Sequence, residues 1–155
     1  MRDLRIPVFP TTTLNANSAF NGQTIDLEAD YANGNHAVGT SLYGLGGFIL
    51  LKNITASGVA FTVVAKSQIS SDGTTWTDHE TIGTFTILSS NKFSLQDGTT
   101  ASPLTRQKLS WRIRTGLRYC RIVLTPASIS GTAAVDASAF LADGSTPLGD
   151  TGILS

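Results

Sequence analysis

Residues 117–142 read Leu-Arg-Tyr-Cys-Arg-Ile-Val-Leu-Thr, then Pro-Ala-Ser-Ile-Ser-Gly, then Thr-Ala-Ala-Val-Asp-Ala-Ser-Ala-Phe-Leu-Ala. Two stretches of alternating apolar side chains therefore flank a link that is rich in turn-forming residues. In an extended strand, every second side chain from Cys120 to Leu124 lies on one face, while Tyr119 and Arg121 lie on the other. The pattern predicts two strands of a sheet that is buried on one face.

The same alternation recurs along the chain at the short intervals that are typical of all-β proteins. One link, residues 70–73, reads Ser-Ser-Asp-Gly and predicts a tight turn in which Gly73 takes a positive φ. No helix of useful length is expected, although residues 105–109 would allow one helical turn. Among sandwich, jelly roll and barrel, we favour a single all-β jelly roll or β-sandwich of about eight antiparallel strands. The predicted strands cover residues 20–27, 47–53, 59–69, 74–80, 84–88, 93–95, 109–114, 117–125 and 132–142.

The length of 155 residues fits one domain, here taken as residues 1–155. Residues 1–13 are expected to form an extended N-terminal arm, because two prolines exclude a central strand. Such an arm either lies on a neighbouring molecule or frays. Residues 14–145 would form the jelly roll, and residues 146–155 a C-terminal tail without a pattern.

The composition narrows the class of partner. Charged residues make up 14 % of the chain, against roughly 25 % in an average protein, and the formal net charge is zero. Bulk charge therefore favours neither nucleic acid nor an anionic membrane as a partner. The chain has no apolar leader and no run long enough to span a bilayer, so we expect it to fold in a cytoplasm. Its single cysteine, Cys120, falls on an apolar strand face and is expected to be a buried hydrophobe.

The residues that usually carry catalysis or bind metals are few and scattered. His36 and His79 have no recognisable partners, and a metal site needs three or four convergent ligands. The carboxylates from Asp26 to Asp30 begin like a calcium loop but lack its later glycine and glutamate. The glycines of residues 44–47 precede a strand, not the helix that a phosphate loop requires. We predict no enzyme activity, no metal and no cofactor.

Basic residues are concentrated near the end of the chain, with six of the eleven between residues 106 and 121. Arg112 and Arg114 share a strand face, and Arg121 would lie near them if the two neighbouring strands pair. A guanidinium group pairs well with a carboxylate, so we interpret these side chains as contacts to a protein partner; the alternative is a solvated basic face. With the arm, the predicted contact residues are Arg2, Arg5, Ile6, Val8, Phe9, Arg112, Arg114 and Arg121.

The order of motifs over residues 14–145 resembles the small jelly-roll cement (decoration) proteins of tailed-phage capsids. The resemblance is carried by Thr-Ile-Asp-Leu (24–27), a long Gly-rich loop, Gly-Phe-Ile-Leu-Leu-Lys (47–52), Val-Ala-Phe-Thr-Val-Val-Ala-Lys-Ser (59–67), Ser-Ser-Asp-Gly-Thr-Thr-Trp (70–76), Leu-Arg-Tyr-Cys-Arg-Ile-Val-Leu-Thr (117–125) and Gly-Thr-Ala-Ala-Val-Asp-Ala-Ser-Ala-Phe-Leu (131–141). The family supplies no catalytic motif, and the contact residues named above come from the residue reasoning alone.

The resemblance implies a structural virion protein that binds the outside of an icosahedral phage capsid and clamps neighbouring major capsid subunits. Its partners would be the major capsid protein and two further copies in a homotrimer, with no nucleic acid, membrane or cofactor. An alternative is a carbohydrate- or receptor-binding β-sandwich module of a phage particle. In that case Trp76, Trp111, Tyr31 and Tyr43 would stack on sugar rings.

Overall fold

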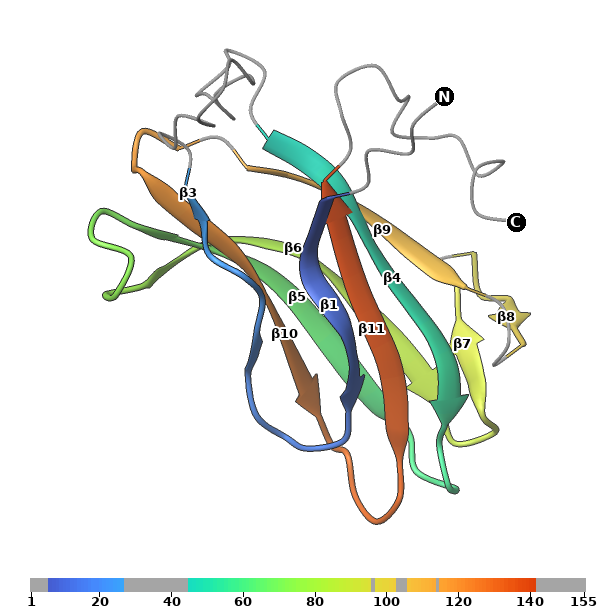
Figure 1. The fold of residues 1–155 in the computed structure, drawn as a ribbon. Helices are drawn as coiled ribbons and strands as arrows, with labels where there is room; N and C mark the ends of the chain where they lie inside the picture. The colour runs from blue at the N-terminus through green and yellow to red at the C-terminus, as the bar shows by residue number, and fades with distance from the viewer. Residues whose placement is uncertain (1–5, 27–44, 96, 103–105, 114, 142–155) are drawn as a thin grey trace.

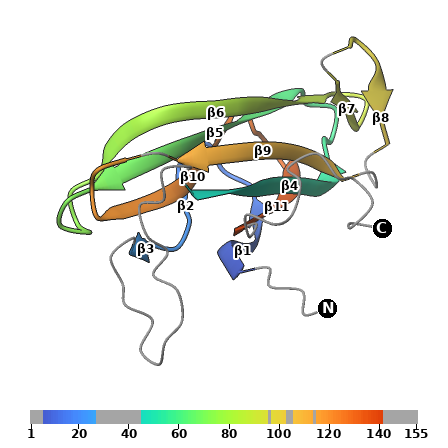
Figure 2. The ribbon, with the colours of Figure 1, turned by 90° about the horizontal axis from the view of Figure 1, so that it is seen from above.

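The protein is a sandwich of two antiparallel β-sheets (Figures 1 and 2). The structure, a computed structural model, describes residues 6–26, 45–95, 97–102, 106–113 and 115–141, apart from the side chains of Ile6 and Leu45. The strands are β1 (Ile6–Leu14), β2 (Phe20–Asn21), β3 (Ile25–Asp26), β4 (Leu45–Thr55), β5 (Phe61–Ser70), β6 (Thr77–Leu88), β7 (Lys92–Ser94), β8 (Thr100–Ala101), β9 (Gln107–Ile113), β10 (Tyr119–Ala127) and β11 (Ala134–Leu141). These described residues contain no helix, and thus none long and apolar enough to cross a membrane.

The order of the strands is that of a jelly roll, as the sequence predicted. One sheet has four strands in the order β1-β11-β4-β9, and the other runs β2-β10-β5-β6-β7-β8, with β3 also paired to β10. If β2 and β3 count as one interrupted strand, the eight main strands divide equally between the two sheets, and the chain crosses repeatedly from one to the other. The short strands β7 and β8 extend the second sheet beyond β6.

The core lies between the sheets and follows the alternation seen in the sequence. Cys120, Ile122 and Leu124 of β10 are fully buried, and so are the alternate residues Phe61, Val63 and Ala65 of β5. The four-stranded sheet contributes Ile49 and Leu51 from β4, and Val135, Ala137, Ala139 and Leu141 from β11. The predicted alternation of buried side chains is confirmed for β5, β10 and β11.

The N-terminal segment differs from the expected arm. Residues 6–14 form β1, which pairs with β11 at the edge of the four-stranded sheet. An edge strand tolerates proline because one side of its backbone needs no sheet partner. The register with β11 shifts between Pro7 and Phe9 and again between Phe9 and Thr12, which accommodates Pro7 and Pro10. Residues 1–5 and 146–155 lie outside the described residues.

Two further sequence predictions are corrected. Residues 74–80 and 84–88 belong largely to a single strand, β6, because its pairing with β5 continues through two register irregularities. The helical turn allowed near residues 105–109 does not form at its described end, where Gln107 to Leu109 begin strand β9.

Candidate functional site

The structure removes two of the predicted contact residues from the surface. Val8 and Phe9 are 2 % and 1 % exposed and belong to the core cluster. Their side chains contact the protein's own interior, so the prediction that they contact a partner is wrong. Edge pairing of β1 explains the difference, because it turns these apolar side chains inward. Arg2, Arg5, Arg114 and the side chain of Ile6 lie outside the described part of the chain.

Arg112 and Arg121 were expected to lie close together only if their two strands paired, and these strands do not pair. Arg112 is exposed on β9, at the edge of the four-stranded sheet, whereas Arg121 lies on β10 in the other sheet. The chain crosses between the sheets after β9 instead of forming a hairpin. The predicted basic cluster is therefore divided, and each arginine has its own surroundings.

Arg121 belongs to a polar network on the outer face of the second sheet. We define the Arg121 surface as Lys66, Gln68, Trp76, Asp78 and Arg121. In the strand register, Gln68 of β5 stands opposite both Arg121 of β10 and Asp78 of β6. The three side chains consequently form a row across three strands, on the face away from the core.

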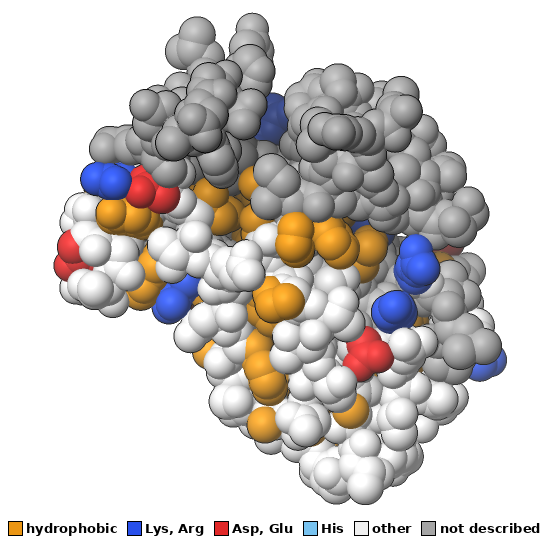
Figure 3. Space-filling view, in the orientation of Figure 1, with side chains coloured by type: hydrophobic (Ala, Val, Ile, Leu, Met, Phe, Trp, Pro, Cys, Tyr) orange, Lys and Arg blue, Asp and Glu red, His pale blue; other side chains and the backbone are white. Residues whose placement is uncertain are grey.

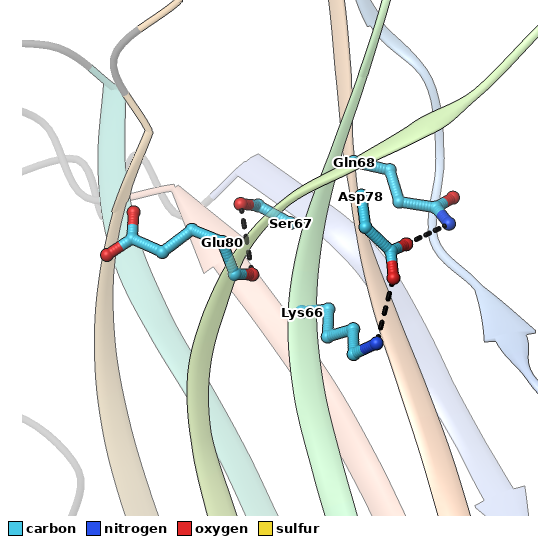
Figure 4. A network of polar contacts seen from close by, with 5 residues as sticks. All are labelled: Lys66, Ser67, Gln68, Asp78 and Glu80. Carbon is cyan, nitrogen blue, oxygen red and sulfur yellow. Dashed lines mark hydrogen bonds and ion pairs between the residues drawn. The ribbon is translucent and has the colours of Figure 1, made fainter.

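Gln68 connects the two charged ends of this row. Its Nε2 donates a hydrogen bond to Oδ1 of Asp78 at 2.8 Å, and its Oε1 accepts one from Nε of Arg121 at 2.9 Å. The other carboxylate oxygen of Asp78 accepts a hydrogen bond from Lys66 Nζ at 2.8 Å. Figure 4 shows Lys66 and Gln68 converging on the carboxylate of Asp78. The amide thus fixes both ends of the row with one side chain.

Trp76 completes the surface from the turn that precedes β6. The guanidinium carbon of Arg121 lies 4.2 Å from the centroid of the Trp76 ring, which is a cation–π contact. Trp76 is half-buried, so part of its ring faces solvent. The other tryptophan, Trp111, is 3 % exposed and packs in the core, which removes it as a surface for sugar stacking. Tyr31 and Tyr43 lie outside the described residues.

The turn between β5 and β6, which leads into Trp76, is ordered by side-chain hydrogen bonds. Oδ1 of Asp72 accepts hydrogen bonds from the backbone N–H groups of Thr74 and Thr75 at 2.8 and 2.7 Å. The Ser70 hydroxyl donates to the same oxygen and accepts from the N–H of Gly73. Gly73 has a φ of 74°, which confirms the predicted tight turn. Side chains thus satisfy the backbone donors of the turn, which limits its freedom.

Charge on the Arg121 surface is unevenly balanced. Hydrogen bonds from Lys66 and then Gln68 lower the pKa of Asp78, so this carboxylate is ionised at neutral pH. Partial burial lowers the pKa of Arg121 from its ordinary value, yet a guanidinium keeps its charge in proteins. The side chains of Lys66 and Asp78 are 38 % and 53 % exposed, so this ion pair contributes little to stability. Two cations and one anion leave the surface positive.

A register irregularity in β6 decides which acid joins the network. Asp78 stands opposite Gln68, whereas Glu80 stands opposite Ser67, a buried residue on the inner side of β5. Figure 4 shows the two acids pointing to opposite sides of the strand. In a regular strand Asp78 and Glu80 would share a face, but the extra residue at His79 separates them. His79 itself is exposed.

Gln68 and Asp78 were not predicted from the sequence to belong to this surface. Their positions in the sequence could have indicated it. Gln68 lies a few residues before the Asp72 turn and Asp78 a few residues after it, so a hairpin brings the two side chains together. Trp76 was considered only as a sugar-stacking residue. Its contact with Arg121 joins segments far apart in the sequence and has no local signature.

The outer face of the four-stranded sheet is a second, different surface. Phe48 and Leu50 point away from the core cluster on β4 but are only 7 % and 6 % exposed. Phe48 stands opposite Phe140 of β11, and Leu50 opposite Lys108 of β9. Figure 3, which views this sheet from outside, shows hydrophobic side chains over its middle and Lys or Arg side chains beside them.

The described residues contain no group of three or more side chains that could hold a metal ion. Asp26, considered above as the start of a calcium loop, accepts two hydrogen bonds from Arg118, at 3.0 and 2.8 Å. The rest of that stretch, with His36, lies outside the described part of the chain. Comparison of the chain with known protein families, curated proteins and solved structures finds no match in any of the three.

Proposed function

We propose that this protein is a cement (decoration) protein, a structural protein that binds the outside of an icosahedral phage capsid and clamps neighbouring major capsid subunits. Its role is binding rather than catalysis, and it acts as a homotrimer on the virion surface. The class of partner comes from the resemblance over residues 14–145 described above. The way in which the protein binds is argued from its own residues.

The observation that carries the proposal is the stacking of Arg121 on Trp76 at the surface of a rigid sheet. Tryptophan and arginine are the residue types that most often supply binding energy in protein interfaces. Here the two are held together before any partner arrives, by Gln68 on one side and the Asp72 turn on the other. Pre-ordered side chains lose little conformational entropy on binding.

The jelly-roll scaffold suits a clamp. Its central strands are paired on both sides, and the core residues of the two sheets are almost completely buried. A scaffold of this kind transmits force between partners without rearranging. A standard specific interface buries about 1,600 Å² in total, and the same contact repeated over many capsid positions would reinforce the whole shell.

Binding to shells tests the proposal directly. Genome-free shells of the phage's major capsid protein are incubated with increasing concentrations of the purified protein and sedimented. We expect saturable co-sedimentation and a density of protein on the outer shell in electron micrographs. Trp76→Ala should weaken binding by about tenfold or more, while Lys92→Met, which removes an exposed cation on β7, should leave it unchanged.

Several outcomes would contradict the proposal. Failure to sediment with the shells at micromolar concentration would exclude the cement function. Specific glycan binding that is lost in a folded Trp76→Ala variant would assign the protein to the carbohydrate-binding class instead. The mass of the protein in solution and on shells, from light scattering and from the density, tests the homotrimer.

A further inference from the structure

We propose that Arg121 is the receptor for a carboxylate of the partner protein, with the Trp76 ring as the apolar surface beside it. This inference rests on the proposed function, because it names the chemistry of the contact through which the protein would bind. It starts from the immediate surroundings of the guanidinium group. Nε donates to Gln68 and the ring of Trp76 lies against it.

Arg121 differs from its cationic neighbours Lys66 and Arg118 in having no acid beside it. Lys66 lies 2.8 Å from Asp78, and Arg118 lies 2.8 Å from Asp26. Within the described part of the chain, no carboxylate is within ion-pair distance of Arg121. The one acid in its row, Asp78, is separated from it by the Gln68 side chain. Lys66 and Arg118 are thus neutralised by aspartates of the protein itself, whereas the Arg121 guanidinium can bind an external anion.

The geometry favours a carboxylate as that anion. A guanidinium group offers five N–H donors in a planar fork, and its Nη edge matches the two oxygens of a carboxylate. Gln68 occupies Nε, and no residue in the described part of the chain accepts a hydrogen bond from the Nη groups, so these remain for a partner. Arg121 is half-buried, so part of the cost of removing its charge from water is already met in the free protein. A carboxylate that docks there gains a charge-assisted hydrogen bond with little additional ordering.

Trp76 and the Lys66–Asp78 ion pair determine which partner residues can lie next to the docked carboxylate. The exposed part of the indole favours an apolar side chain next to the acid. Asp78 would repel a second carboxylate placed over the end of the row at β6. The surface therefore fits a segment in which a single acid is flanked by apolar residues.

A pair of short peptides tests the chemistry in isolation. The probes are N-acetyl-Leu-Glu-Leu-amide and its Leu-Gln-Leu counterpart, titrated into the full-length protein and followed by NMR. The Glu peptide should shift the signals of the Arg121 Nε–H and the Trp76 indole N–H, and the Gln peptide should not. Arg121→Met should weaken binding of the Glu peptide by about tenfold or more, Arg121→Lys should weaken it less, and Lys92→Met should not change it.

The outcomes are distinct. Equal shifts with both peptides, no shift with either, or undiminished binding of the Glu peptide by folded Arg121→Met would overturn the inference. Tighter binding of inorganic phosphate than of the Glu peptide would also overturn it, because the receptor would then be for phosphate. If the Glu peptide binds but shells do not, the cement function fails and the carboxylate receptor stands. If shells bind wild type and Arg121→Met equally, Arg121 is not part of the shell contact and the inference is overturned, while the cement function stands.

Discussion

The ammonium nitrogen of Lys108 lies 5.2 Å from the centroid of the Phe48 ring, on the outer side of the four-stranded sheet. This nitrogen is buried, and no hydrogen-bond acceptor contacts it in the described part of the protein. A cation–π contact contributes about 0.5–2 kcal/mol, whereas removal of an ammonium ion from water costs several kcal/mol. The contact with Phe48 is too weak to offset that cost, so we expect Lys108 to lower the stability of the isolated protein.

Replacing Lys108 with methionine should therefore stabilise the protein. The substitution Lys108→Met keeps the unbranched stem against Leu50 and Phe48 and removes the charge. We expect the midpoint of thermal unfolding to rise by about 2–4 °C for each kcal/mol gained, measured by circular dichroism. Lys92→Met, at an exposed position of β7, is the control and should have little effect. A lower midpoint for Lys108→Met would show that the ammonium group stabilises the fold.

Gly47 is a position where the two neighbours of β4 leave no room for a side chain. A Cβ atom there would overlap the carbonyl oxygen of Phe140 on β11 and come within 2.9 Å of the Trp111 ring on β9. Gly47→Ala should destabilise the protein by about 1–3 kcal/mol, because strands that are packed together must separate. Urea unfolding followed by tryptophan fluorescence measures this change.

Gly116 provides the matched control for that experiment. Apart from its two chain neighbours, no atom of the described residues lies within 4 Å of the position that its Cβ would occupy, and its φ is outside the left-handed region. Gly116→Ala should be neutral or stabilising by up to about 1 kcal/mol, because alanine restricts the unfolded chain. Equal destabilisation at both positions would indicate a general cost of replacing glycine rather than a clash at Gly47.

The buried faces of the strands were predictable because alternation is a local property. Whether Ile122 and Arg121 point to opposite sides follows from extended geometry alone, whatever strand lies next to them. Which strands pair with one another is not a local property of the sequence. Nothing in the sequence near Arg112 and Arg121 distinguishes a hairpin from a crossing between sheets, and the observed connection is the crossing.

The N-terminal segment and the candidate site were difficult to predict from the sequence, for related reasons. Prolines in residues 6–14 exclude a central strand but not an edge strand, and the sequence does not show where an edge will be. The Arg121 surface depends on the extra residue at His79, which turns Asp78 outward. A bulge of this kind is fixed by pairing across the sheet, so alternation along β6 alone gives the wrong faces.

Acid should destabilise the protein in a range set by its hydrogen-bonded aspartates. The N–H groups of Thr75 and Thr74, and then the Ser70 hydroxyl, hold the pKa of Asp72 well below its ordinary value. An unfolded aspartate titrates near pH 3.9, so the stabilisation from Asp72 is fully present above that pH and is lost as the pH falls through the folded pKa. The pKa values of Asp78, Asp97 and Asp136 are lowered too, and their contributions have the same sign.

Asp72→Asn separates this effect from general acid unfolding. The variant should unfold at a lower temperature than wild type at pH 7, and the difference should shrink as the pH falls from about 5 to 2. Thermal unfolding at a series of pH values measures it. A difference that stays constant across this range would mean that the turn depends on the shape of the Asp72 side chain and not on its charge.

The thiol of Cys120 is expected to be unreactive in the folded protein. Its side chain is fully buried on the inner face of β10, and burial raises the pKa of its thiol to about 12. The thiolate is the reactive form, and the raised pKa keeps the thiol protonated at pH 8. Ellman's reagent should therefore label the native protein only at the rate of its unfolding, and should label one thiol per chain at once in denaturant. Rapid labelling of the native protein, with a rate that increases with reagent concentration, would mean that β10 separates from the core without global unfolding.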